Sequence, residues 1–252
     1  MDYKVITNPE NPLCGKSYEE VLEMVKKDGC VLQFVKQQTA ELCLVAVQQD
    51  GCVLRYVQHQ TPELCLAAVK QNGWALDYVK QQTPEICLAA IKQNGRVLQY
   101  VKEQTLELCL AAVQEDPWAL QHVKRQTSEI CLLSDFIFIL AVQRNGRVLQ
   151  FVEQKTPEIC LAAVQQNGFA IKFIEEQTPE LCLAAVKQDG CVIVYTQHQT
   201  PDICLAAVQQ DGLALQYIKE QTLELCLAAV KQNNHVLKLV WDEFYADIEA
   251  SL

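Results

Sequence analysis

Cysteine is the residue type that could carry the most chemistry in this chain, because 13 cysteines occur in 252 residues. Nine recur at one position of a repeated motif: Cys43, Cys65, Cys87, Cys109, Cys131, Cys160, Cys182, Cys204 and Cys226. Thiolates can bind metals or carry redox chemistry. Stacked helices lie roughly 8–10 Å apart, however, which exceeds the reach of a disulfide or a shared zinc site. We therefore predict small, buried, reduced side chains and no metal or cofactor.

Three other cysteines, Cys30, Cys52 and Cys191, each follow a glycine in the repeat. If that glycine precedes a second helix, the thiols lie at its N-terminus, where the helix dipole favours the thiolate. These cysteines could be reactive, although the sequence places no general base beside them.

Acidic residues also recur in register, at Glu41, Glu63, Glu85, Glu107, Glu129, Glu158, Glu180, Asp202 and Glu224. A row of carboxylates could bind cations. Each acidic residue lies one or two positions after the start of a helix, however, where it compensates the helix dipole. We favour this structural role.

The four histidines do not form a recognisable catalytic or metal-binding motif. They are His59, His122, His198 and His235, and no Ser-His-Asp arrangement, HExxH motif or paired CxxC spacing accompanies them. We predict structural or solvent-exposed histidines, and a protein that is not an enzyme.

Cationic and aromatic residues cluster in the more variable half of repeats one to five. Seven cations occupy this half against two carboxylates, Asp77 and Glu103, in a chain whose net charge is −10. Lysines near a helix C-terminus can be explained by the helix dipole, but the arginines and tryptophans cannot. Exposed tryptophan beside arginine is typical of interaction hot spots and of stacking platforms for single-stranded nucleic acid. The candidate partner-binding residues are Arg55, Trp74, Lys80, Arg96, Lys102, Trp118, Lys124 and Arg125.

These residues belong to ten tandem repeats. The repeats start at Ser17, Thr39, Thr61, Thr83, Thr105, Thr127, Thr156, Thr178, Thr200 and Thr222. Successive starts follow a 22-residue period, except that the step from Thr127 to Thr156 is seven positions longer. Regular spacing of this kind is typical of solenoid proteins, in which each repeat packs only against its neighbours.

The sequence of each repeat predicts two helices. In the repeat that begins at Thr61, threonine caps the first helix, Pro62 occupies its first turn and the left-handed Gly73 ends it. A second surface helix then runs through residues 74–81, with Ala75 and Leu76 on its buried face. The expected fold is all-α, an α/α solenoid of ten 22-residue helix-turn-helix repeats.

Seven additional residues interrupt the sixth repeat, within residues 127–155. We expect the first helix to absorb them and to lengthen by about 10 Å. The apolar residues Phe136, Ile137, Phe138 and Ile139 would then either protrude as a contact for a partner or a second copy, around residues 132–140, or fold back as local packing.

The ends of the chain fit a single repeat domain over residues 17–240. Residues 1–16 form an N-terminal extension, and residues 241–252 are expected to form a capping helix that covers the last repeat. Asn234 stands where eight of the other repeats have glycine and the fifth has Pro117, and asparagine also enters the left-handed region. No signal peptide or membrane-spanning stretch is found, so we expect a cytoplasmic protein with reduced thiols.

The recurring string AVKQNGWALDYV, with its variants AIKQNGRVLQYV and AVQQDGLALQYI, resembles a family of tandem repeats described only as a domain of unknown function. The resemblance rests on an A-V-x-x-[ND]-G-x-A-L-x-Y pattern and covers about residues 17–240. It implies a tandem helical repeat, and it brings no activity, cofactor or catalytic residue.

The net charge of −10 argues against general affinity for phosphate backbones. We therefore expect a non-catalytic scaffold or adaptor that binds a protein or peptide, preferably acidic, through the outer face of the second helices. The alternatives are binding of single-stranded nucleic acid or RNA by the basic and aromatic residues of repeats two to five, and a self-assembling structural protein.

Overall fold

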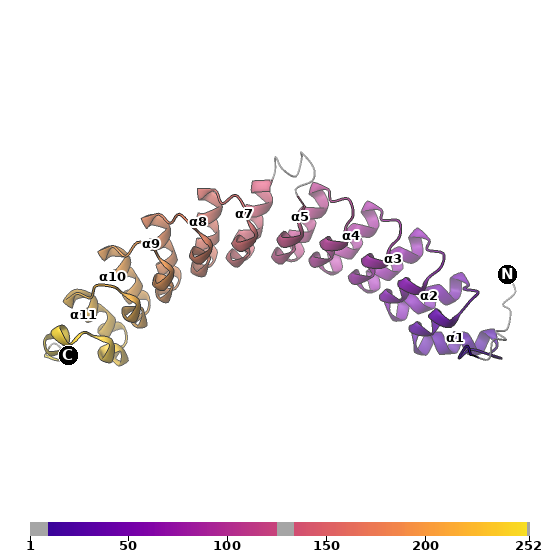
Figure 1. Ribbon diagram of the computed structural model, residues 1–252, viewed down its shortest axis with the longest axis horizontal. Helices are drawn as coiled ribbons and strands as arrows, with labels where there is room; N and C mark the ends of the chain where they lie inside the picture. Colours follow the sequence, from indigo (N-terminus) through magenta and orange to yellow (C-terminus); the bar gives the residue numbers. More distant parts are fainter. Residues whose placement is uncertain (1–9, 125–133, 251–252) are drawn as a thin grey trace. The chain divides into compact units, whose positions relative to one another are not determined.

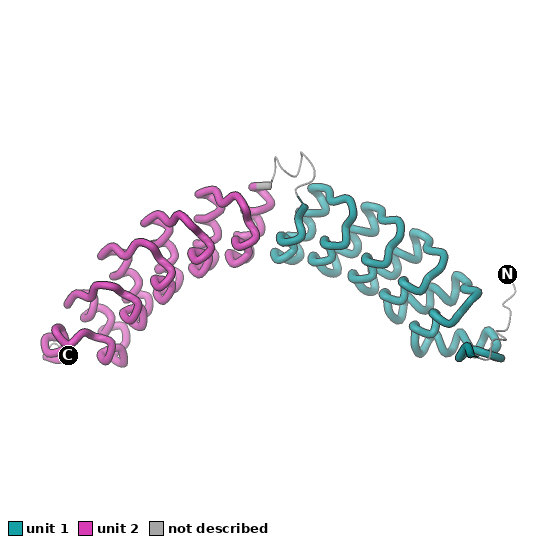
Figure 2. The backbone as a smooth tube through the Cα atoms, in the orientation of Figure 1, with its two compact units in different colours: residues 1–133 teal, residues 134–252 magenta. Residues whose placement is uncertain are grey.

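The structure is a computed structural model that describes residues 10–124 and 134–250. The described residues form α-helices and 3₁₀ helices, labelled α and η, and contain no strand. The chain divides into two compact units, residues 1–133 and 134–252, which Figure 2 shows in different colours. The repeat region expected over residues 17–240 crosses this boundary, and each unit is described separately.

In the first unit, α-helices and 3₁₀ helices alternate along the chain. Each α-helix packs on the α-helices of adjacent repeats and on the 3₁₀ helices of its own and the preceding repeat. The two kinds of helix form two layers within the unit (Figure 1). Their bounds are α1 Tyr18–Lys27, η1 Gly29–Phe34, α2 Ala40–Gln49, η2 Gly51–Tyr56, α3 Pro62–Gln71, η3 Gly73–Tyr78, α4 Pro84–Gln93, η4 Gly95–Tyr100, α5 Leu106–Glu115 and η5 Pro117–His122.

The second unit repeats this arrangement and ends with an additional α-helix, α12. Its helices are α7 Ser134–Arg144, η6 Gly146–Phe151, α8 Pro157–Gln166, η7 Gly168–Phe173, α9 Pro179–Gln188, η8 Gly190–Tyr195, α10 Pro201–Gln210, η9 Gly212–Tyr217, α11 Leu223–Gln232, η10 Asn234–Leu239 and α12 Asp242–Glu249. The all-α repeat fold expected from the sequence is confirmed.

Outside the sixth repeat, the first helix of each repeat begins as the sequence predicts. In α3 the hydroxyl oxygen of Thr61 accepts a hydrogen bond from the Leu64 N–H at 3.3 Å. Pro62 occupies the first turn, where its missing N–H has no consequence. The apolar side chains of the helix, among them Leu64 and Val69, enter the core between adjacent repeats.

The second helix differs from the expected α-helix over residues 74–81, because it is a six-residue 3₁₀ helix. In η3 the Ala75 N–H donates to the Asn72 carbonyl at 2.9 Å, as the three-residue period requires. That period aligns Gly73, Leu76 and Val79, and all three are buried. The expected division between buried and exposed faces is confirmed, but the helix type is not.

The expected left-handed glycine is wrong, because among the described residues only Gly15 has a positive φ. Asn72 ends α3 in an extended conformation, and its side-chain oxygen accepts from the Trp74 N–H to begin η3. Glycine is needed at residue 73 for another reason. A Cβ atom there would lie 2.7 Å from the Ala90 carbonyl oxygen of the next repeat. Asn234 is accommodated without positive φ, and its side chain is exposed.

The sixth repeat has a different register from the one expected. Helix α7 aligns with α8 when Ser134 is matched to Thr156, so the regular spacing of the repeats resumes at Ser134. Phe138 then occupies the position of Cys160 in the core and is 4% exposed. The additional residues therefore precede α7, in the segment 127–133, which lies outside the described residues.

The first repeat begins with a polar capping motif, and the last repeat is covered by apolar contacts of α12. Ser17 and Glu20 form a capping box at the start of α1, which gives Glu20 a specific role at the terminal repeat. At the other end, Ile248 of α12 is fully buried, as a helix that covers the last repeat requires. Trp241 and Tyr245 contribute less to this cover, because they are 43% and 38% exposed.

Among the described helices, none combines the length and the apolar character required to cross a lipid bilayer.

Candidate partner-binding face

The candidate residues of the first unit lie on the exposed side of η2 to η5 and of the turns that follow them. We call this surface the η face. The three-residue period of a 3₁₀ helix places the second and fifth residues of each helix above one another and outward. In η3 these residues are Trp74 and Asp77, and both are exposed.

Among the described cations of this face, Arg55 is the one that lies on an aromatic platform. Its guanidinium carbon is 4.7 Å from the centroid of the Tyr56 ring and 5.9 Å from that of Tyr78, in the next repeat. Among the described residues Arg55 forms no salt bridge with a carboxylate. Stacking restricts the side chain while its charge remains exposed to solvent. Arg55 is therefore positioned to receive an acidic group.

The two tryptophans differ in their exposure. Trp74 is 38% exposed, and its ring meets Tyr100 of the next repeat edge to face, with centroids 5.8 Å apart. Trp118 is half-buried, and its main-chain N–H donates to Oδ1 of Asp116 at 2.9 Å. Trp74 thus adds exposed aromatic surface on the same 3₁₀ helix as Tyr78, whereas Trp118 contributes less exposed surface.

Arg96 is engaged in an ion pair within the protein. Its Nε donates to Oδ2 of Asp116, in the following repeat, at 2.6 Å. Both side chains are partly exposed, so the pair adds only about 0–1 kcal/mol of stability. Its charge is largely compensated, and Arg96 is a weaker candidate than Arg55.

The lysines of the η face bind main-chain carbonyls of the preceding repeat. Lys80 Nζ donates to the Gln58 carbonyl at 3.1 Å, and Lys102 Nζ donates to the Lys80 carbonyl at 2.9 Å. Lys124 is exposed. Arg125, the last candidate on this face, lies outside the described residues.

The second unit carries a similar platform with a different cation. Lys172 Nζ lies 5.6 Å from the Phe173 centroid and 5.9 Å from that of Tyr195. Lys172 is the fifth residue of η7, as Arg55 is the fifth residue of η2. The surrounding turns carry Glu153, Glu175 and Glu176, so this platform lies in more acidic surroundings.

A row of glutamines joins adjacent repeats, which the sequence reasoning missed. Gln60, directly before the Thr61 cap, donates from Nε2 to the Tyr78 carbonyl of the next repeat at 2.8 Å. Its Oε1 accepts from the Lys80 N–H at 3.0 Å. Comparable bonds are made by Gln38, Gln82, Gln104, Gln177, Gln199 and Gln221. We call these seven residues the clamp glutamines; the uniform QT dipeptide was the signal for them.

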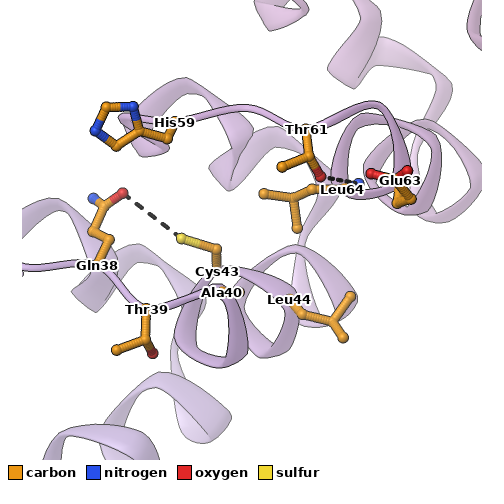
Figure 3. A pocket seen from close by; sticks show the side chains of 9 residues that line it. All are labelled: Gln38, Thr39, Ala40, Cys43, Leu44, His59, Thr61, Glu63 and Leu64. Carbon is orange, nitrogen blue, oxygen red and sulfur yellow. Dashed lines mark hydrogen bonds between the residues drawn. The ribbon is translucent and has the colours of Figure 1, made fainter. Parts of the chain in front are cut away.

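The cysteine ladder is part of this same arrangement. Figure 3 shows the thiol of Cys43 directed at Gln38 in a pocket between α2 and α3, where Sγ donates to Oε1 at 3.7 Å. Burial raises the pKa of the Cys43 thiol, and it raises that of Cys109 to about 11. No group of three or more potential metal-binding side chains occurs in the described part of the chain. Cys131 lies outside it.

Two of the cysteines at the start of the 3₁₀ helices, Cys52 and Cys191, are poor nucleophiles, in contrast to the reactivity considered from the sequence. Burial, followed by the charge of Asp50, raises the pKa of Cys52. Burial and a hydrogen bond to Asp211 raise the pKa of Cys191 to about 12. At neutral pH both residues are thiols, so the favourable helix dipole is outweighed.

The recurring acidic residues that the structure describes lie in the first turns of the α-helices. The pKa values of Glu63 and Glu180 are lowered by main-chain hydrogen bonds in the first turn and by the capping threonines. This agrees with the role in helix capping. Glu129 lies outside the described residues.

The histidines occupy separate surroundings. His198 Nε2 is 2.8 Å from the Gln177 carbonyl, whereas burial and the charge of Arg96 lower the pKa of His122. Both His59 and His235 are exposed.

Only part of the apolar cluster in α7 is available for contacts. Phe136 is 59% exposed, at the position where α8 has Glu158. Ile137 is fully buried and Phe138 nearly so, while Ile139 is half-buried. The local-packing interpretation is thus confirmed for Ile137 and Phe138, which are no longer contact candidates. Phe136 retains that possibility.

A family model described as "Domain of unknown function (DUF4116)" matches residues 61–106, 137–178, 158–199 and 200–245. The chain belongs to this family. Its overlapping matches agree with a tandem repeat. No curated protein and no solved structure matches the chain. Membership of the DUF4116 family identifies the repeat and leaves its partner to be inferred from the surface.

Proposed function

We propose that this DUF4116 protein is a non-catalytic scaffold or adaptor that binds an acidic segment of another protein on the η face of the first unit. The observation that carries the proposal is the position of Arg55. Its charge is exposed, its side chain is held between Tyr56 and Tyr78, and among the described residues no carboxylate neutralises it. Exposed arginine and aromatic side chains dominate the binding energy of many protein interfaces.

Other residues of the η face add to such an interface. Trp74, on the same 3₁₀ helix as Tyr78, offers exposed aromatic surface, and Lys124 is a further exposed cation of this face. An acidic segment would gain charge complementarity over a face whose polarity is opposite to that of the whole chain.

A protein partner is favoured over nucleic acid because the cations do not form a continuous track. Lys80 and Lys102 bind main-chain carbonyls, and Arg96 is paired with Asp116. A phosphate backbone requires many neutralising contacts, and the net charge of −10 opposes its approach. A few well-placed acidic side chains require only local complementarity.

We also infer self-association through Phe136 as a second activity. The side chain is 59% exposed where other repeats carry an acidic residue, and large exposed apolar groups mark contact sites. Its neighbour Ile139 is half-buried.

We further propose a reducing, cytoplasmic compartment. The twelve cysteines that the structure describes are all free thiols. Many of them donate to clamp glutamines, a bond that requires the protonated thiol.

The proposal is tested with two fluorescein-labelled probes, a peptide of alternating glutamate and tyrosine and an oligouridine of similar length. Fluorescence anisotropy would be measured for the full chain at increasing salt concentration. We expect the acidic peptide to bind more tightly at near-physiological ionic strength. Tighter binding of the oligouridine, with a steep loss of affinity as salt rises, would replace the proposal with nucleic-acid binding. Failure of both probes to bind would contradict a cationic docking face.

A further inference from the structure

The clamp glutamines define what each junction between repeats requires. At seven described junctions a carboxamide donates to a main-chain carbonyl of the next repeat, and its oxygen also accepts from the main-chain N–H two positions beyond that carbonyl. At Gln221 this N–H belongs to Trp241, so even the last repeat is joined in this way. A primary carboxamide supplies the donor and the acceptor from two separate atoms, whereas a hydroxyl offers both on one oxygen.

One described junction of the second unit lacks the carboxamide. Lys155 precedes the Thr156 cap of α8, at the position of the clamp glutamines. The main-chain groups that a glutamine would bind there are the Phe173 carbonyl and the Glu175 N–H. Among the described residues neither group has a hydrogen-bond partner. Lysine carries no acceptor, so it cannot satisfy the N–H.

The first repeat also has a lysine in place of the clamp glutamine. Lys16 occupies the clamp position before Ser17, and its ammonium group pairs with Glu20. The carbonyl that a glutamine at position 16 would bind belongs to Phe34. That carbonyl accepts a hydrogen bond from Nδ2 of Asn11 at 2.8 Å. A carboxamide from outside the repeat thus replaces the donor of the missing clamp, while its oxygen accepts from the Leu13 N–H.

The corresponding space beside Lys155 is open. A pocket of about 670 Å³ lies between α8 and α9, against about 340 Å³ at Gln38 and 180 Å³ at Gln82. Its lining includes Cys160. The equivalent cysteine of most other repeats donates from its thiol to a clamp glutamine, but Cys160 has no clamp glutamine to bind. The substitution therefore leaves both space and unused polar groups.

We propose that the pocket beside Lys155 binds the primary carboxamide of a glutamine or asparagine side chain presented by another polypeptide segment. The carboxamide would donate to the Phe173 carbonyl and accept from the Glu175 N–H, as Gln177 does with the Tyr195 carbonyl and the Gln197 N–H of the next repeat. The bound segment would join α8 to α9 as Asn11 joins the N-terminal extension to η1. This site is separate from the η face of the first unit.

The chemistry of the pocket discriminates between possible ligands. A carboxylate has no donor for the Phe173 carbonyl, and it would approach the lining residues Glu175 and Glu176. An ammonium group has no acceptor for the Glu175 N–H. Only a group with both functions restores the pattern that the other junctions display.

The test uses the ¹⁵N-labelled full chain and N-acetyl-glutamine methylamide as the probe, with N-acetyl-glutamate methylamide as its near-isosteric control. We expect a saturable shift of the Glu175 amide resonance with the glutamine probe and a much weaker response to the glutamate probe. Equal responses to the two probes, or the absence of a saturable shift, would overturn the proposal.

Two variants separate occupation of the pocket from a general surface effect. Lys155→Gln restores the sequence of the other repeats, so it should fill the site and abolish the response of Glu175. Lys155→Ala leaves the space open and should retain the response. A response in Lys155→Gln equal to that of the wild type would place the probe elsewhere.

Hydrogen exchange provides a readout that needs no ligand. The Glu175 amide should exchange faster in the wild type than in Lys155→Gln, and the equivalent Gln197 amide should be equally slow in both proteins. Equal exchange at Glu175 would show that the wild type already satisfies this group.

Propionamide tests the source of the carboxamide. Binding weaker than that of the glutamine probe supports a polypeptide, whereas equal binding would contradict the polypeptide part of the proposal.

Discussion

Gln104 of the turn after η4 joins its repeat to His122 of the next one. Its Nε2 donates to the His122 carbonyl at 2.9 Å and to the Leu98 carbonyl at 3.1 Å. Its Oε1 accepts from the Lys124 N–H at 2.8 Å, and the side chain is only 7% exposed. This one buried carboxamide connects three main-chain groups, so each repeat depends on its neighbour through polar as well as apolar contacts.

Replacement of Gln104 by alanine should destabilise the first unit. The substitution leaves the His122 carbonyl and the Lys124 N–H without their partner, and loss of buried hydrogen bonds of this kind costs about 1–3 kcal/mol. Urea unfolding followed by circular dichroism would measure the loss.

Gln121→Ala is the matched control, because Gln121 is exposed on the neighbouring 3₁₀ helix. It should change the free energy of unfolding by less than about 0.5 kcal/mol. An equal loss in the two variants would show that the clamp contributes nothing specific.

The comparison with Gln104 also explains what the sequence could reveal. The repeat period, the Thr61 cap and the buried positions of Leu64 and Val69 follow from local rules, because caps and apolar periodicity are properties of a single helix. The clamp is a contact between residues 18 to 20 positions apart. Its recognition requires the stacking geometry, which local rules do not give.

The 3₁₀ helices were missed for a related reason. Gly73 looked like the end of a helix, but its role is to allow close approach to the Ala90 carbonyl of the next repeat. The chain can therefore remain extended at Asn72 and begin a short helix immediately. The register of the sixth repeat was assigned to Thr127 because the local sequence TSEICL matches a repeat start. Packing instead places Phe138 in the position of the ladder cysteine.

For the candidate face, the sequence identified which positions are exposed. It did not show which of these side chains bind other groups of the protein. Arg55 and Arg96 had equal standing as candidates. Their difference depends on Asp116, which belongs to the repeat after that of Arg96 and neutralises it. No analogous ion pair is found at Arg55 among the described residues.

The buried thiols should make stability depend on pH under alkaline conditions. Burial raises the pKa of Cys109 to about 11, above the value of about 8.5 expected in the unfolded chain. Between these values the unfolded state has lost a proton that the folded state keeps, so the free energy of unfolding falls as pH rises. Below this window the contribution of the thiol is constant. Urea unfolding at a series of pH values would show the decline.

Cys109→Ala isolates this contribution from the titration of lysines and tyrosines. The variant should be less stable at neutral pH because it loses buried volume and the bond to Gln104. Its stability should fall less steeply than that of the wild type at alkaline pH. Parallel pH profiles for the two proteins would be inconsistent with a raised thiol pKa.

Phe136→Asp should weaken any self-association without unfolding the second unit, because the side chain is 59% exposed. Light scattering coupled to size exclusion would compare the molar mass of wild type and variant over a range of concentrations. A dimer that becomes a monomer is the expected result. A wild-type protein that is monomeric at all concentrations would refute self-association through this residue.

Val194→Asp is a suitable control, since Val194 is 48% exposed on η8 of the same unit. It should leave the molar mass unchanged. If both variants dissociate the dimer, the effect arises from added charge and not from Phe136.

The central claim, that Arg55 anchors an acidic partner, is tested most directly by charge reversal at two equivalent positions. Arg55→Glu and Lys172→Glu alter the fifth residue of η2 and of η7, and each residue lies on a pair of aromatic rings. Binding of the glutamate- and tyrosine-containing peptide would be measured by fluorescence anisotropy, with thermal unfolding as a check on folding. The account predicts at least about a tenfold loss of affinity, or ~1.4 kcal/mol, for Arg55→Glu. It predicts little change for Lys172→Glu. Equal loss in both variants, or unchanged affinity in Arg55→Glu, would contradict it.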